Sequence, residues 1–111
     1  MPAKSILKSV LITGCSEGGI GHTLALEWKT RGYRVFATAR TLGAMTTLEQ
    51  AGIECFEMDV TDVDTMKTVK DQVAEKTGGK LDILVNNAGQ GKPPRFPHFS
   101  DLRVYDAFIG L

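Results

Sequence analysis

The residues with the clearest chemical potential form a glycine-rich stretch near the amino end, TGCSEGGIG at residues 13–21. Glycines permit a tight turn and let the backbone approach a pyrophosphate, while the start of a following helix directs N–H groups and a positive dipole toward it. A tight strand-to-helix turn without a ligand is the alternative. The position of the stretch, directly after the first predicted strand, favours phosphate binding.

The elements that would position this stretch alternate along the chain. A continuous apolar run predicts a strand at residues 9–13, and strand-like stretches follow at residues 33–39, 54–60 and 81–85. Apolar residues at helical spacing predict three intervening helices, which are marked by Ile20, Leu24, Ala25 and Trp28, by residues 44–50, and by Val63, Met66, Val69 and Val73. Crossovers of this length join parallel strands. The sequence therefore predicts an α/β fold, a Rossmann-type parallel sheet with helices on both faces.

The ends of the predicted helices carry recognisable signals. Gly32, Gly52 and the Gly78-Gly79 pair follow the helical stretches and predict their ends. Thr61 with Asp64 three residues later resembles a capping box for the third helix, although aspartate replaces the usual glutamate or glutamine.

The composition excludes several classes of protein. The 111 residues are 42% hydrophobic, and thirteen basic residues balance thirteen acidic ones, which argues against nucleic acid as the main partner. The two cysteines form no metal-binding or disulfide pattern, so we expect no metal site and a reducing compartment, the cytoplasm. No apolar run is long enough for an integral membrane segment, although peripheral membrane association stays open.

Three motifs together resemble the short-chain dehydrogenase/reductase family. These are TGCSEGGIG, the Asp59-Val60 pair after the third predicted strand, and NNAG at residues 86–89 after the fourth. Their order and approximate spacing match the family over nearly the whole chain up to Gly89. The stretch GIGHTLALEWKTRGYRVFATAR is most similar to fungal members related to 1-acyl-dihydroxyacetone-phosphate reductase. One departure is that four residues, Cys15 to Gly18, precede the Gly-Ile-Gly, where the common pattern has three.

The resemblance implies a bound dinucleotide and a set of residues that hold it. The loop from Gly14 to Gly21 would surround the pyrophosphate and nicotinamide side, Asp59 would bind the adenine amino group, and Asn87 would brace the strands and touch the adenine-side ribose. A solvated strand-end carboxylate and a turn asparagine are the respective alternatives. The cofactor-binding residues expected in this way are Ile12, Gly14, Ser16, Gly19, Ile20, Gly21, Thr38, Arg40, Asp59, Val60, Asn87 and Gly89.

Arg40 directs the choice of cofactor. It follows the second predicted strand, where an acid would accept from the ribose 2′-OH of NAD and an arginine favours the 2′-phosphate of NADP. Residues 38–41 contain no acid, so NADP is predicted. An ordinary surface arginine is the alternative.

The sequence also leads to expectations for two residues in or next to the loop. His22, on the first turn of the first helix, is expected at the surface. Cys15 lies near a helix N-terminus, which could lower its pKa, although the family has a small residue there without reactive duty.

No catalytic residue is expected within this chain. The family uses Tyr-x-x-x-Lys with an upstream serine, but Tyr33 lies inside a predicted strand and Tyr105 has Ile109 as its fourth following residue. Residues 90–111 predict a proline-rich loop and a partial helix, in which Ala107 or Phe108 stands about where the family has asparagine. We therefore expect residues 1–111 to form a single truncated NADP-binding domain, without the C-terminal half of the family fold and inactive alone.

Two other interpretations stay open: a non-catalytic NADP-binding or scaffolding module, and a truncated gene product without function. Because the family's interface helices lie further along the chain, a family-type homo-oligomer is not expected. The edge of the fourth predicted strand would instead invite irregular association.

Overall fold

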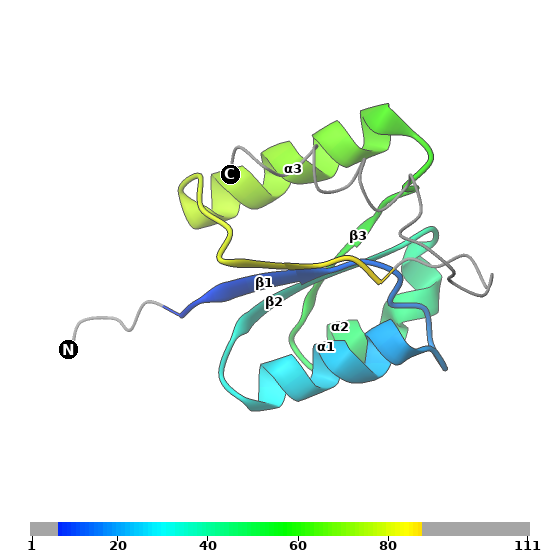
Figure 1. The fold of residues 1–111 in the computed structure, drawn as a ribbon. Helices are drawn as coiled ribbons and strands as arrows, with labels where there is room; N and C mark the ends of the chain where they lie inside the picture. The colour runs from blue at the N-terminus through cyan, green and yellow to red at the C-terminus, as the bar shows by residue number, and fades with distance from the viewer. Residues whose placement is uncertain (1–6, 88–111) are drawn as a thin grey trace.

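The computed structural model describes residues 7–87 of the protein, and within this range strands alternate with helices (Figure 1). The strands are β1 (Ser9–Ile12), β2 (Arg34–Ala39), β3 (Glu54–Glu57) and β4 (Ile83–Val85). The helices are α1 (Ile20–Thr30), α2 (Thr46–Gln50) and α3 (Val63–Thr77), with a 3-10 turn, η1 (Leu42–Met45), before α2. Every strand pair is parallel, in the order β3-β2-β1-β4. The predicted parallel α/β sheet is confirmed.

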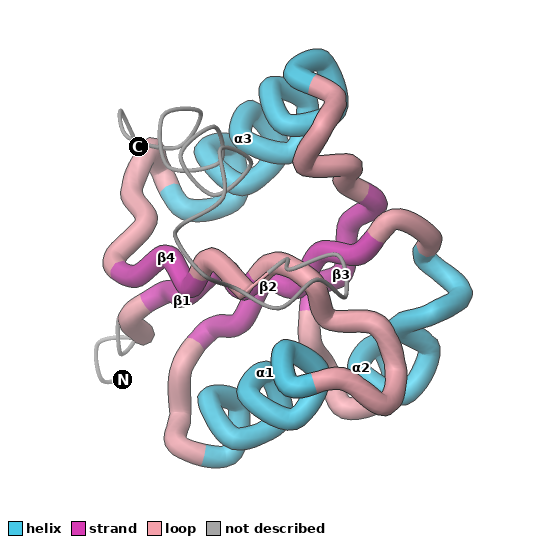
Figure 2. Tube along the Cα trace, turned by 45° about the vertical axis from the view of Figure 1, so that its right-hand side comes forward, coloured by secondary structure: helices cyan, strands magenta, loops and turns pink. Residues whose placement is uncertain are grey.

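The central strands are buried on both faces. Successive side chains of a strand point to opposite sides, so Val10 and Ile12 lie in the core beneath α1 and α2. Leu11 and Phe36 lie in the second core, with residues of α3. Figure 2 shows α1 and α2 on one side of the strands and α3 on the other. This double burial explains why β1 is apolar at almost every position.

The structure corrects several local predictions. The strands are shorter than the predicted stretches of residues 54–60 and 81–85, since β3 ends at Glu57 and β4 begins at Ile83. Asp62, not Thr61, caps α3, because its side chain accepts from the N–H of Asp64. Val63 was predicted on the inner face of α3 but is 55% exposed, because it is the first residue of that helix. Gly78 ends α3 in the left-handed conformation, as its type predicts.

The order of the strands reverses beside β1. From β1 the chain continues to β2 and β3 on one side of the sheet, and reaches β4 on the other side afterwards. In open parallel sheets, ligands bind beyond the carboxyl ends of the strands at such a reversal. The residues directly after β1 and β4 meet there, and this point is called the switch point below.

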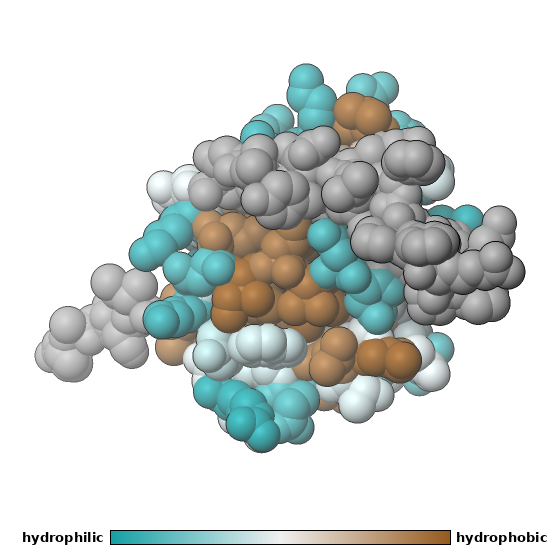
Figure 3. Space-filling model, in the orientation of Figure 1, coloured by the Kyte–Doolittle hydropathy of each residue, from teal (hydrophilic) through white to brown (hydrophobic). Residues whose placement is uncertain are grey.

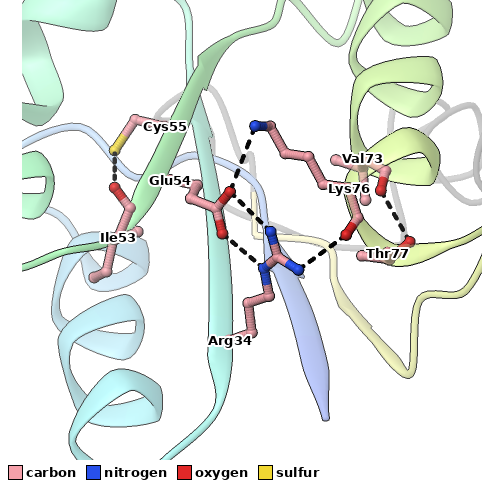
Figure 4. A network of polar contacts seen from close by, with 7 residues as sticks. All are labelled: Arg34, Ile53, Glu54, Cys55, Val73, Lys76 and Thr77. Carbon is pink, nitrogen blue, oxygen red and sulfur yellow. Dashed lines mark hydrogen bonds and ion pairs between the residues drawn. The ribbon is translucent and has the colours of Figure 1, made fainter. Parts of the chain in front are cut away.

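A polar cluster ties three elements together at the opposite, amino-terminal edge of the sheet (Figure 4). Arg34 opens β2 and donates to both carboxylate oxygens of Glu54 on β3, from Nε at 2.8 Å and from Nη2 at 3.2 Å. It also donates through Nη1 to the carbonyl oxygen of Lys76 on α3 at 3.0 Å. The hydrogen bond to Glu54 raises the pKa of Arg34. This cluster is far along the strands from the switch point.

Strand β4 forms one end of the described sheet and pairs with β1 alone. Its residues Ile83, Leu84 and Val85 are half-buried. Figure 3 shows an apolar patch in the middle of the face along which β4 runs in Figure 1. Among residues 7–87, the longest helices are too short and too polar to span a bilayer.

Candidate functional site

The glycine-rich loop, residues 13–19, leaves β1 at the switch point and leads into α1. Gly14 has a φ of 71° and Gly18 a φ of 89°, a region that glycine enters without steric cost. The N–H of Gly19 donates to the carbonyl oxygen of Ser16 at 3.1 Å, so residues 16–19 form a turn with Gly18 in its third position. This turn lies within the four-residue stretch, Cys15 to Gly18, that precedes the Gly-Ile-Gly.

Two backbone hydrogen bonds fix the loop to the end of β2 and to η1. The N–H of Cys15 donates to the carbonyl oxygen of Thr38 at 2.9 Å, and that of Glu17 donates to the carbonyl oxygen of Ala44 at 2.9 Å. Thr38 is buried near the end of β2, and Ser16 is exposed. The loop is therefore held against the segment that carries Arg40.

Helix α1 begins without an acceptor of its own. Gly19 is its N-cap residue, no side chain among residues 7–87 caps the first turn, and that turn contains no acidic residue. Helix α3 of the same protein is capped by the Asp62 side chain and has Asp64 in its first turn. The first N–H groups of a helix need an acceptor, and together with the helix dipole they favour an anion. The start of α1 is suited to a phosphate group.

Gly21 lets α1 approach the two strands at the switch point. A Cβ at this position would clash with the carbonyl oxygen of Gly14 and lie 2.6 Å from Nδ2 of Asn87. No side chain larger than a hydrogen fits there without movement of the backbone. Ile20, by contrast, points outward and is 72% exposed.

Asn87 connects β4 to the loop. Its Nδ2 donates to the carbonyl oxygen of Gly14 at 3.1 Å, and its backbone N–H donates to Oγ1 of Thr13 at 2.9 Å. The N–H of Thr13 in turn donates to the carbonyl oxygen of Val85 at 3.1 Å. These bonds give Asn87 the bracing role that the resemblance implied for it.

Asp59 lies after β3, on the same edge of the sheet. Its Oδ1 accepts from the backbone N–H of Thr61 at 2.9 Å and from the Thr61 hydroxyl at 2.6 Å. These bonds lower the pKa of Asp59, and the charge of Arg40 lowers it further. The carboxylate is half-exposed, whereas the Val60 side chain is buried in the core with α3. Asp59 is thus ionised and oriented at neutral pH.

Arg40 directly follows β2 and is exposed. The preceding residue, Ala39, is fixed by the N–H of Met58, which donates to its carbonyl oxygen at 2.9 Å. Ile12, the last residue of β1, is fully buried beneath α1 and α2. The structure thus gathers the predicted residues from Ile12 to Asn87 at one edge of the sheet, while Gly89 and the prediction for residues 90–111 lie outside the described residues.

The expectation for His22 is wrong, and the pKa of Cys15 is not lowered. His22 is 8% exposed instead of lying at the surface, and its Nδ1 lies 3.3 Å from the carbonyl oxygen of Cys15. The Cys15 thiol donates to the carbonyl oxygen of Ile12 at 3.2 Å, and burial raises its pKa to about 12. The loss of hydration on burial outweighs the backbone hydrogen bond involving Thr38, which lowers the pKa of Cys15. His22 precedes Ala25 by three residues, and Gly21 precedes Ala25 by four. This helical spacing would have placed His22 on the inner face with them.

Sequence reasoning also missed two carboxylates beside the site. Oε2 of Glu17 accepts from the Thr47 hydroxyl at 3.4 Å, and Oε2 of Glu57 accepts from the backbone N–H of Leu42 at 3.0 Å. Both connect the segment after Arg40 to its surroundings. The sequence does not indicate these contacts, although Glu17 lies within the glycine-rich motif, because each carboxylate acts through a residue distant in the chain.

Comparison with known proteins decides the family. A family model described as short chain dehydrogenase matches residues 8–109. This chain belongs to the short-chain dehydrogenase family. The resemblance recognised in its motifs is thereby confirmed.

Individual members of the family are similar to this chain over part of their length. The chain is 50% identical over 82 residues to the NADPH-dependent 1-acyldihydroxyacetone phosphate reductase of Schizosaccharomyces pombe, covering 74% of this chain and 28% of that protein. A short-chain dehydrogenase from Streptomyces avermitilis superposes with a TM-score of 0.77 at 29% identity, covering 93% of this chain and 43% of that one. The structure of ElxO with NADP bound gives a TM-score of 0.61 at 33% identity, covering 73% and 34%. The chain thus spans less than a third of its curated relative.

Proposed function

We propose that this chain supplies the NADP(H)-binding half of a short-chain dehydrogenase that interconverts a carbonyl and an alcohol. The observation that carries the proposal is the start of α1, which lacks a side-chain cap and an acid and stands at the switch point beside the Asn87–Gly14 bond. A pyrophosphate supplies the acceptor that these N–H groups lack. When bound, NADPH supplies the hydride, and the residues of this chain hold and orient it.

The neighbouring strand ends indicate where the remaining parts of the nucleotide would bind. We place the adenine beside Asp59 and Val60, after β3, and the adenine-side ribose near Asn87. Arg40 is exposed after β2 and would meet the 2′-phosphate. The NADPH dependence named for the Schizosaccharomyces pombe relative and the NADP in the ElxO structure support this choice of cofactor.

Catalysis is not expected from these 111 residues by themselves. The sequence contains no Tyr-x-x-x-Lys, and general acid–base catalysis contributes about 10² to 10⁴ in rate. NADPH oxidation with a panel of ketones should match the control without protein. If the chain oxidised NADPH with a ketone, and a substitution in the chain abolished this turnover, this part of the proposal would be contradicted.

We also propose the cytoplasm as the compartment of the protein.

Calorimetric titration of NADPH and NADH tests the assignment of Arg40. A charge-assisted hydrogen bond contributes about 1.5 to 3 kcal/mol, and 1.4 kcal/mol is tenfold in affinity, so NADPH should bind about 10- to 100-fold tighter. Arg40→Asp should reverse the order, because the acid repels the phosphate and accepts from the free 2′-OH. Lys67→Asp is the matched control, since it makes the same charge change on the exposed side of α3. Equal affinities for the two nucleotides in the unmodified chain would reject the assignment.

A further inference from the structure

Two contacts from the end of β3 hold the segment that contains Arg40. The N–H of Met58 donates to the carbonyl oxygen of Ala39 at 2.9 Å, on one side of Arg40. On the other side, Oε2 of Glu57 accepts from the backbone N–H of Leu42 at 3.0 Å. Arg40 and Thr41 therefore form a two-residue span between anchored neighbours. Of the two anchors, the contact from Glu57 is the one that a side-chain substitution can remove.

The charge of Glu57 gives it no direct attraction for a phosphate. Asp59 already places one carboxylate within electrostatic reach of Arg40, since the arginine lowers the pKa of Asp59. A second carboxylate on the same strand end would repel a 2′-phosphate at close range. The benefit of Glu57 must come from its hydrogen bond, which fixes the backbone next to Arg40 and reduces the freedom that binding would otherwise remove.

We propose that Glu57 is a positioning residue for cofactor discrimination. By holding Leu42, Glu57 keeps Arg40 in a position from which it can bind a 2′-phosphate. Glu57 therefore sets the preference for NADPH over NADH without contacting the nucleotide. The inference rests on the proposed function, because it requires Arg40 to bind the 2′-phosphate.

The test compares four proteins by calorimetric titration with NADPH and NADH: the full chain, Glu57→Ala, Glu57→Gln and the control Glu75→Ala, which removes an exposed carboxylate from α3. Glu57→Ala should weaken NADPH binding by about 3- to 10-fold and leave NADH binding unchanged. Glu57→Gln should retain most of the preference, because its amide oxygen still accepts a hydrogen bond. Glu75→Ala should match the unmodified chain.

A second background separates positioning from general stability. In Arg40→Ala, the further change Glu57→Ala should not weaken NADPH binding, because the residue that Glu57 positions is gone. If Arg40→Ala abolishes the preference while Glu57→Ala keeps it, the inference is overturned and the proposed function stands. If Glu57→Ala weakens the binding of both nucleotides equally, or weakens NADPH binding in the Arg40→Ala background as well, Glu57 has only a structural role and the inference is overturned. A chain without any preference for NADPH overturns both proposals.

Discussion

The side-chain amide of Asn87 donates to the carbonyl oxygen of Gly14 and thereby joins the residues that follow β4 and β1 across the switch point. The two residues are 73 positions apart in the sequence. The geometry of the glycine-rich loop consequently depends on β4, the last described strand. Binding of a nucleotide to this loop should be sensitive to changes at either partner.

Asn87→Ala should lower the free energy of unfolding by about 1 to 3 kcal/mol, because the carbonyl oxygen of Gly14 loses its partner in a half-buried place. Asn87→Asp should cost at least as much at neutral pH, since it sets a carboxylate oxygen against that carbonyl. Urea denaturation of the variants measures both effects. Unchanged midpoints would show that the bond contributes nothing to stability.

Gly21→Ala should destabilise the fold by about 1 to 3 kcal/mol and weaken nucleotide binding, because α1 has to move away from Gly14 and Asn87. The matched control is Gly43→Ala in η1, where an added Cβ meets no atom within 4 Å. Thermal unfolding and NADPH titration of both variants provide the comparison. A tolerated methyl group at position 21 would contradict the close packing.

Both thiols should be unreactive in the folded protein at pH 8. Burial raises the pKa of Cys15 to about 12 and that of Cys55 to about 11, and the thiolate is the reactive form. A colorimetric disulfide reagent should titrate two thiols quickly in guanidinium chloride and hardly any in buffer. Cys15→Ala and Cys55→Ala identify the source of a residual signal, and fast labelling of folded Cys15 would disprove the effect of burial.

The stability of the fold should fall in acid. The N–H of Ser9 donates to Asp82 at 2.8 Å, and this bond lowers the pKa of Asp82, as the Thr61 bonds do for Asp59. A carboxyl group with a lowered folded-state pKa stabilises the fold above its unfolded pKa, near 4, and this stabilisation is lost as the pH falls through the folded value. Asp82→Asn should flatten the decline of urea midpoints below pH 4, with Asp71→Asn on α3 as the control.

The free edge of β4 should promote association that increases with concentration. The strand pairs with β1 alone in the described sheet, and its apolar residues are half-buried, so its outer N–H and C=O groups are available to another chain. Light scattering over a concentration series measures this. A monomer of constant mass at high concentration would contradict it.

The sequence predicts the order of the elements well and their contacts poorly. Apolar runs such as Val10-Leu11-Ile12 and the TGCSEGGIG and NNAG motifs suffice for the parallel sheet and for the grouping of Gly14, Asp59 and Asn87, because the carboxyl ends of parallel strands share one edge. The burial of His22 depends on how α1 is rotated against the sheet. That rotation is set by the close approach of Gly21 to Gly14 and Asn87, which follow β1 and β4, and the spacing from His22 to Ala25 is only a weak local sign of it.

The contacts of Glu17 and Glu57 escape prediction for a related reason. Each carboxylate binds a residue of the segment after β2, and the partner is at least fifteen positions away. Glu57 is part of no motif, and Glu17 occupies a position of the glycine-rich motif that is not glycine, so both would have been assigned to solvent. Such tertiary contacts appear only when the register of β3 against β2 and the path of the glycine-rich loop are known.

The separation of the two edges of the sheet also matters for engineering. The helix-to-strand turns at Gly32, Gly52 and Gly78-Gly79 all lie at the amino-terminal edge, and an added atom at Gly78 or Gly79 meets nothing within 4 Å. New termini opened between Gly78 and Gly79, or a fluorescent reporter inserted there, would stand at the end of the sheet remote from Gly14 and Asn87. A circular permutant cut at this place would therefore carry its reporter without crowding the nucleotide.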